Sequence, residues 1–156
     1  MSNDITLRPV KISDADLLLA WRNDPGTRSA SHNTDEVSRE NHIAWLTKTL
    51  ENPNRRLLIA EKSGVPVGTV RADFDDGVWE LSWTTAPNAR GQGVAKGMVA
   101  LLAQQIPEPI RAEIKPENTP SIRVAEDAGM IFNREVDGVM HYSRAAMGSQ
   151  ATHKKP

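Results

Sequence analysis

Short apolar runs and alternating apolar and polar positions recur along this chain, each bounded by turn residues. An alternation with a period of two residues predicts β-strands. Seven such segments are present, at residues 5–10, 56–61, 66–74, 78–85, 110–115, 130–136 and 139–144. The dipeptides Ser63-Gly64, Asp76-Gly77 and Asp137-Gly138 lie between consecutive segments and predict tight turns. Gly68, inside a predicted strand, indicates a bulge.

Apolar positions with helical spacing predict four helices, at residues 14–22, 39–50, 94–105 and 120–129. Three of them follow a capping signal. Ser13 with Asp16 reads as a capping box before the first helix, Ser38 can cap the second, and Thr119 can cap the fourth. Residues 29–37 are polar and predict a loop.

The resulting order, β-α-α-β-β-β-α-β-α-β-β, predicts an α/β (α+β) fold with a mixed central sheet of about seven strands and helices on both faces. No repeat or linker divides the chain. We therefore expect one domain over residues 1–146, followed by a disordered polar tail over residues 147–156.

Composition narrows the possible functions. The 156 residues carry a formal net charge of -1, which disfavours nucleic acid as a partner. The absence of cysteine excludes disulfides, thiolate metal sites and a cysteine nucleophile, and we expect no metal site. No apolar run approaches the length of a membrane span, and the first residues do not resemble a signal peptide. We expect a cytoplasmic protein without a membrane partner.

The sequence Arg90-Gly91-Gln92-Gly93-Val94-Ala95 connects a predicted strand to a predicted helix. Two glycines let a ligand approach the backbone closely, and the free N–H groups and the dipole of the helix start favour an anion. The third glycine of a dinucleotide fingerprint and the Gly-Lys-Ser/Thr of a nucleotide-triphosphate loop are both missing. The segment therefore predicts another kind of phosphate site, with a plain glycine turn as the structural alternative.

This loop resembles the acyl-CoA pyrophosphate loop of the GNAT superfamily of N-acyltransferases, and the order of elements resembles the GNAT fold over nearly the whole chain. The resemblance implies acetyl-CoA as co-substrate. Its pyrophosphate would be held by the backbone of the loop and helix start, and its pantetheine arm would pair with the end of the preceding strand while the following strand splays away. The residues so implied in cofactor binding are Thr84, Thr85, Arg90, Gly91, Gln92, Gly93, Val94, Ala95, Lys96 and Asn118.

The resemblance also indicates the chemistry. Glu113 matches a position that serves as general base in some family members, and Glu80 is the reserve candidate. An acceptor amine is largely protonated at neutral pH and must lose a proton before it attacks. For Glu113, an exposed strand residue or an ion pair is the structural alternative. Many relatives carry a Tyr as general acid where this chain has Ala125, so no general acid is assigned.

The first third of the chain resembles a GNAT branch that acetylates amino groups of sugar nucleotides, including pseudaminic-acid pathway enzymes. Ribosomal-protein N-acetyltransferases share part of this pattern. The implied acceptor-binding residues are Trp21, Arg22, Arg28, His42 and Trp45. Arginine side chains can bind phosphate groups, and Trp side chains can stack on flat rings of a ligand. Core packing is the alternative for both Trp residues and for His42.

These observations predict an N-acetyltransferase that moves an acetyl group from acetyl-CoA to a small-molecule amine, such as an amino sugar or sugar nucleotide, by direct attack in a ternary complex. Two alternatives remain: a ribosomal-protein or peptide N-terminal acetyltransferase, and a non-catalytic acyl-CoA-binding module. The family resemblance also allows a homodimer.

Overall fold

The computed structural model describes residues 4–31 and 34–148, and these form one seven-stranded sheet in the order β1-β2-β3-β4-β5-β7-β6. Only β4 and β5 are parallel; the other neighbours are antiparallel. The strands are β1 (Ile5–Pro9), β2 (Arg55–Lys62), β3 (Val65–Asp75), β4 (Val78–Thr85), β5 (Ile110–Ile114), β6 (Ile131–Val136) and β7 (Val139–Arg144). The predicted fold class and mixed sheet are confirmed.

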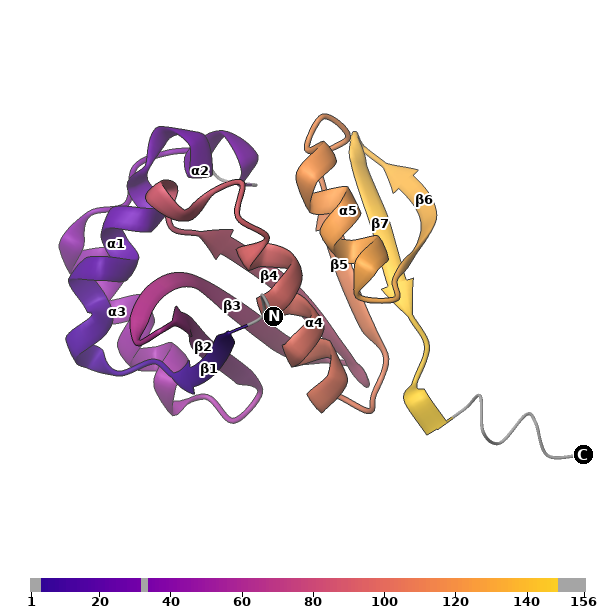
Figure 1. Ribbon diagram of the computed structural model, residues 1–156, viewed down its shortest axis with the longest axis horizontal. Helices are drawn as coiled ribbons and strands as arrows, with labels where there is room; N and C mark the ends of the chain where they lie inside the picture. Colours follow the sequence, from indigo (N-terminus) through magenta and orange to yellow (C-terminus); the bar gives the residue numbers. More distant parts are fainter. Residues whose placement is uncertain (1–3, 32–33, 149–156) are drawn as a thin grey trace, which may run out of the picture.

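Helices cover both faces of the sheet (Figure 1). They are α1 (Ala15–Asn23), α2 (Pro25–Ala30), α3 (Arg39–Glu51), α4 (Val94–Gln105) and α5 (Thr119–Asp127), with 3-10 turns η1 (Ile12–Asp14) and η2 (Pro87–Ala89). In β3, Gly68 approaches Met98 of α4, whereas Arg71 lies over the ring of Trp45 of α3. Since residues three apart point to opposite faces of a strand, α3 and α4 lie on opposite sides of the sheet.

The predicted bulge lies at Gly68. Ala60 pairs with Gly68 but Glu61 pairs with Pro66, so Val67 is the extra residue of β3. A Cβ atom on Gly68 would lie 2.9 Å from the carbonyl oxygen of Thr84, which is closer than real Cβ contacts allow. Glycine at this position lets β3 and β4 approach and lets α4 pack above them.

Helix starts differ from the sequence prediction at three places. Ser13 and Asp16 do not form a capping box; instead the carboxylate of Asp14 accepts the N–H of Lys11 at 2.8 Å, and η1 precedes α1. The predicted loop is partly helical, because Asp24 caps α2 and Pro25 occupies the first helical position. In α5 the cap is Asn118, not Thr119. The Ser38 cap is confirmed by its hydrogen bond from Asn41 N–H.

The chain remains attached to the domain as far as Met147, whose N–H donates to the carbonyl of Pro107 at 2.8 Å. Met147, which the sequence analysis places in the polar tail, is thus hydrogen-bonded to the domain. Residues 149–156, the remainder of the predicted tail, lie outside the described residues.

Within the described part of the chain, none of the helices has the length and apolar character that are needed to cross a membrane.

Arg144 joins the last strand to the end of α4. Its guanidinium donates to the carbonyls of Ala103 and Ile106 at 2.9 and 2.7 Å and to Glu108 at 2.9 Å. Terminal helix carbonyls need partners outside the helix. We expect Arg144→Met to lower the free energy of unfolding by about 2 kcal/mol, because buried acceptors lose a charged donor. Urea denaturation measures this, and Arg123→Met on the surface of α5 is the control expected to change little.

A second cluster ties β1 to η1 and β2. Arg8 donates to Asp14 at 2.9 Å and to Glu61 at 2.7 Å, and this hydrogen bonding lowers the pKa of Asp14. A carboxyl with a lowered native pKa stabilises the fold above its unfolded pKa, and this contribution disappears as the pH falls through the native value.

We therefore expect Asp14→Asn to destabilise the protein by about 1 kcal/mol at pH 7, with the difference from the parent vanishing under acid conditions. Thermal unfolding across a pH series measures it. Asp16→Asn, which removes an exposed ion pair with Arg39, is the control. A constant difference from pH 7 down to strongly acidic pH would contradict the role of the Asp14 charge.

Candidate functional site

The two central strands separate soon after they meet. β4 pairs with β5 only at Trp79–Ile110 and Glu80–Arg111, while β3 accompanies β4 to Thr85 and β7 accompanies β5 to Ile114. Beyond Glu80, the edge of β4 that faces β5 has no partner strand among the residues that the structure describes. Such an edge offers backbone N–H and C=O groups to an extended ligand with amide groups. Figure 1 shows the two strands diverging toward the end that carries α2 and the start of α4.

The glycine loop lies at this wide end, between η2 and α4. Gly91 and Gly93 both have φ of +78°, a left-handed conformation that glycine adopts without strain. Among the described residues, and apart from the chain neighbours of each glycine, no heavy atom lies within 4 Å of the place where either Cβ would be, so the loop surface is open there. The first turn of α4 has no side-chain cap and no acidic residue. Its N–H groups are therefore suited to an anion, as the sequence indicates.

Within this loop, the side chains that lead into the helix differ in their roles. Val94, the first residue of α4, is buried, whereas Gln92 and Lys96 are exposed. Arg90 turns toward α2, where its guanidinium contacts Asp24 at 2.5 Å and the hydroxyl of Thr27 at 3.2 Å. This contact holds the pKa of Asp24 below its usual value. The sequence analysis did not identify Asp24; an Asp directly before a Pro is the signal in the sequence that indicates this helix cap.

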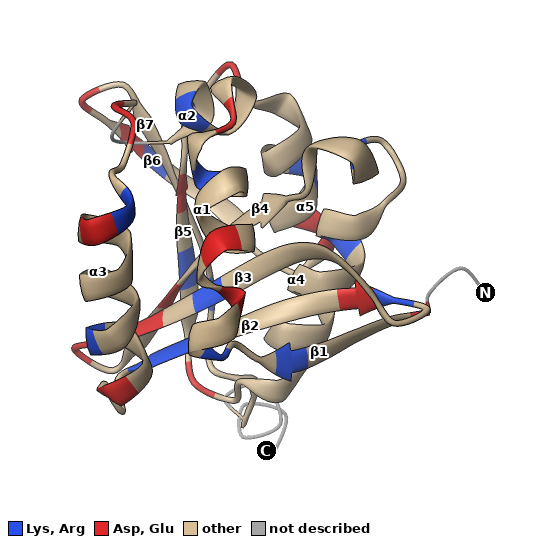
Figure 2. Cartoon of the chain, turned by 90° about the vertical axis from the view of Figure 1, so that its left-hand side faces the viewer, with Lys and Arg blue, Asp and Glu red and all other residues tan. Residues whose placement is uncertain are grey.

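Glu80 and Glu113 lie on one face of the sheet, at the point where β4 and β5 part. Glu80 pairs in register with Arg111, so the two share a face, and Glu113 follows two residues later on the same side of β5. Arg111 donates to the carboxylate of Glu80 at 3.3 Å. Glu113 lies opposite His141 of β7 and is half-buried. Figure 2 shows this side of the molecule, with α3 beside the strands. The face also carries Arg71 and Asp73, which are ion-paired at 3.0 Å.

The five residues that we predict to bind the acceptor differ in how deeply they are buried. Trp21 and His42 are only 6% and 5% exposed, on α1 and α3, and burial lowers the pKa of His42. Packing, the structural alternative, is favoured for these two. Trp45 is partly exposed; its ring stacks on His42 with centroids 5.7 Å apart and lies 5.6 Å from the guanidinium carbon of Arg71.

The two arginines of this group lie on neighbouring helices. Arg22 is near the end of α1, and Arg28 is on α2. The Nε atom of Arg28 is buried and has no hydrogen-bond partner among the described residues. A guanidinium N–H can donate a charge-assisted hydrogen bond to an anionic group.

The residues around α5 have structural roles: they cap the helix or are buried. Asn118 Oδ1 accepts the N–H of Ser121 at 3.3 Å and so caps the helix. Ala125, at the position where the family resemblance led us to look for a general acid, is completely buried and has no proton to donate. Tyr142 is 3% exposed and its pKa is raised by burial.

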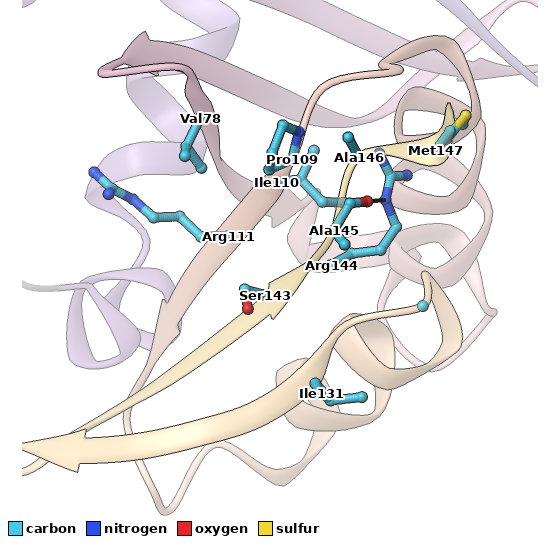
Figure 3. Close-up of a pocket in the computed structure, with 11 residues that line it drawn as sticks. Val78, Pro109, Ile110, Arg111, Ile131, Ser143, Arg144, Ala145, Ala146 and Met147 are labelled. Carbon is cyan, nitrogen blue, oxygen red and sulfur yellow. Dashed lines mark hydrogen bonds between the residues drawn. The ribbon is translucent and has the colours of Figure 1, made fainter. Parts of the chain in front are cut away.

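A separate hollow of about 630 Å³ lies at the opposite, paired end of β4 and β5. Figure 3 shows its lining, including Val78, Pro109, Arg111, Ile131 and Met147. None of the predicted site residues lines it. Within the part of the chain that the structure describes, no cluster of His, Cys, Asp and Glu could hold a metal ion.

Comparison with known proteins agrees with this geometry. Residues 4–131 match a family model described as an acetyltransferase (GNAT) domain. No curated protein sequence matches the chain.

Several solved structures share the fold. An aminoglycoside acetyltransferase, AAC(6')-Ib, in complex with ribostamycin and coenzyme A superposes with a TM-score of 0.81 at 19% identity, covering 98% of this chain and 99% of that one. A ribosomal-protein-alanine N-acetyltransferase from Brucella melitensis gives 0.75 at 23% identity, covering 90% and 99%. A spermidine N-acetyltransferase chimera with a Vibrio cholerae part gives 0.78 at 14% identity, covering 98% and 99%.

Proposed function

This chain belongs to the GNAT acetyltransferase family, and we propose that it transfers the acetyl group of acetyl-CoA to the amine of a small molecule that also carries an anionic group, such as a sugar nucleotide. The observation that carries the cofactor assignment is the open glycine loop at the start of α4, beside the unpaired edge of β4. A pyrophosphate fits the loop, and an amide-rich arm fits the edge.

The proposed acetyl transfer takes place at the point where β4 and β5 separate, and it uses the groups that lie there. The acceptor nitrogen attacks the thioester carbon, the N–C bond forms, the C–S bond breaks, and coenzyme A leaves as a thiolate. Glu113 takes the proton of the amine, directly or through water. A thiol with a pKa of about 8.5 is a tolerable leaving group, so the absence of a Tyr at Ala125 does not prevent transfer. Direct transfer suits a chain without cysteine.

The charges around the site support an acceptor with an anionic group. The carboxylates on the face of β3 and β4 already have arginine partners: Asp73 contacts Arg55 and Arg71, and Glu80 contacts Arg111. A polycationic acceptor would need carboxylates that are free to bind it. Arg28 has a buried donor to offer instead. The aminoglycoside and spermidine acetyltransferases named above share the fold, and their acceptors differ from the one proposed.

One observation each supports two other functions. Similarity in fold to a ribosomal-protein-alanine N-acetyltransferase supports a peptide N-terminus as acceptor. The buried Ala125 in place of a proton donor supports an acyl-CoA-binding module without turnover.

The acceptor class is tested with a thiol-release assay over uridine-diphosphate amino sugars, N-terminal alanine peptides, spermidine and kanamycin. We expect turnover on the sugar nucleotides, and we expect Arg28→Met to raise their KM about tenfold through loss of a charge-assisted hydrogen bond. Arg39→Met, on α3 and away from the loop, is the matched control. A preference for spermidine or kanamycin that is unchanged by Arg28→Met would reject the anionic acceptor.

A further inference from the structure

Helix α2 spans the wide end of the opening between β4 and β5. Near its start, Asp24 and Thr27 bind Arg90 of the glycine loop, which follows β4. Near its end, the carbonyl of Ser29 accepts the Nζ of Lys115, just after β5, at 2.9 Å. In Figure 1, α2 lies beside the loop that leads into α4. The helix is thus held from both sides by basic side chains.

Little else holds this helix. It has six residues, and none of them is buried. A helix of this length is not stable alone in water, so its order depends on its contacts. Apart from the hydroxyl of Thr27, which accepts Arg90, the side-chain hydrogen bonds of this segment within the described residues are local, such as that from the hydroxyl of Ser31 to the carbonyl of Thr27 at 2.8 Å. The contacts to Arg90 and Lys115 are therefore decisive.

The shorter of the two contacts with the loop is made by the same carboxylate oxygen that caps α2. Asp24 Oδ2 accepts the N–H of Thr27 at 3.1 Å, which caps α2, and also accepts Arg90. Gly26 leaves space for the guanidinium: a Cβ there would come within 3.1 Å of Arg90 Nη1. A movement of Arg90 therefore changes the helix cap directly.

From these contacts we propose that Asp24 is a positioning residue that links the cofactor loop to α2, so that coenzyme A bound at the loop stabilises α2 and the acceptor-binding Arg28 that it carries. The link rests on the proposed function, since it requires a cofactor at the loop. Asp24 contacts the loop only through Arg90, so coenzyme A should still bind to Asp24→Asn, with an affinity reduced by no more than the coupling between the loop and α2.

The test is amide hydrogen exchange measured by mass spectrometry on the parent and on Asp24→Asn, with and without coenzyme A. In the parent, we expect coenzyme A to slow exchange both in the loop, residues 90–96, and in α2. In Asp24→Asn, the loop should still be protected, whereas α2 should exchange several-fold faster and gain no protection. Arg90→Gln removes the same pair from the loop side and should give the same α2 result.

Asp16→Asn is the matched control, because it removes an arginine–carboxylate pair on the neighbouring helix α1. It should behave as the parent. Protection of α2 by coenzyme A that persists in Asp24→Asn, or that is absent in the parent despite a protected loop, would overturn the link alone. A loop that coenzyme A protects in none of the proteins would overturn the proposed function, and the link with it.

Discussion

Replacing Gly93 with valine is expected to weaken coenzyme A binding by at least about 100-fold, because two or more charge-assisted hydrogen bonds to the pyrophosphate are lost. Gly93 has φ of +78° and precedes the first turn of α4. A branched side chain there would disfavour the left-handed backbone and fill the space over the helix N–H groups. Isothermal titration calorimetry measures the affinity.

Gly138 provides a matched control for this substitution. It has the same φ of +78°, also with open space around it, but lies in the turn between β6 and β7. Gly138→Val should therefore cost similar stability while leaving coenzyme A affinity unchanged. Equal loss of affinity in the two variants would show that strain, rather than the cradle, explains the effect.

Glu113→Gln is expected to lower kcat by about 10²- to 10⁴-fold, the usual contribution of a positioned general base. Coenzyme A affinity should remain, because Glu113 lies on β5 rather than in the loop. The amide is nearly isosteric with the carboxylate but cannot take the proton from the acceptor. Initial rates over a range of pH measure the effect, and the residual activity should rise with pH as free amine becomes more abundant.

Glu80 provides a comparison for this test because it lies on the same face of the sheet and its carboxylate contacts Arg111. Glu80→Gln should have the smaller effect on kcat, since Glu113 is the proposed base and Glu80 the reserve candidate. Glu135→Gln, on the exposed strand β6, is the control expected to match the parent. A larger kcat loss for Glu80→Gln than for Glu113→Gln would transfer the role of base to Glu80.

The sequence predicted most of the sheet, because strand signals here are local. Turn pairs such as Asp76-Gly77 and Asp137-Gly138 adopt the positive φ values that tight hairpins need. The glycine loop was also predictable, since its two glycines and the helix start form one continuous segment. These features depend on neighbours in the chain.

Other features depend on residues far apart in sequence. Helix α2 was missed because Gly26, Thr27 and Ser29 favour loops, and its order depends on Arg90 and Lys115, more than 60 residues away. Helical periodicity placed Trp21 and His42 on a helix face but could not show whether that face meets the core or a ligand. The structure shows both to be buried.

Acetyl transfer is tested most directly by the release of free coenzyme A from acetyl-CoA, measured with and without each amine of the panel. We expect thiol release only when an accepting amine is present, in equal amount to the N-acetylated amine detected by mass spectrometry. Tight binding of acetyl-CoA with no thiol release on any amine would contradict it and leave the chain as an acyl-CoA-binding protein of the GNAT family.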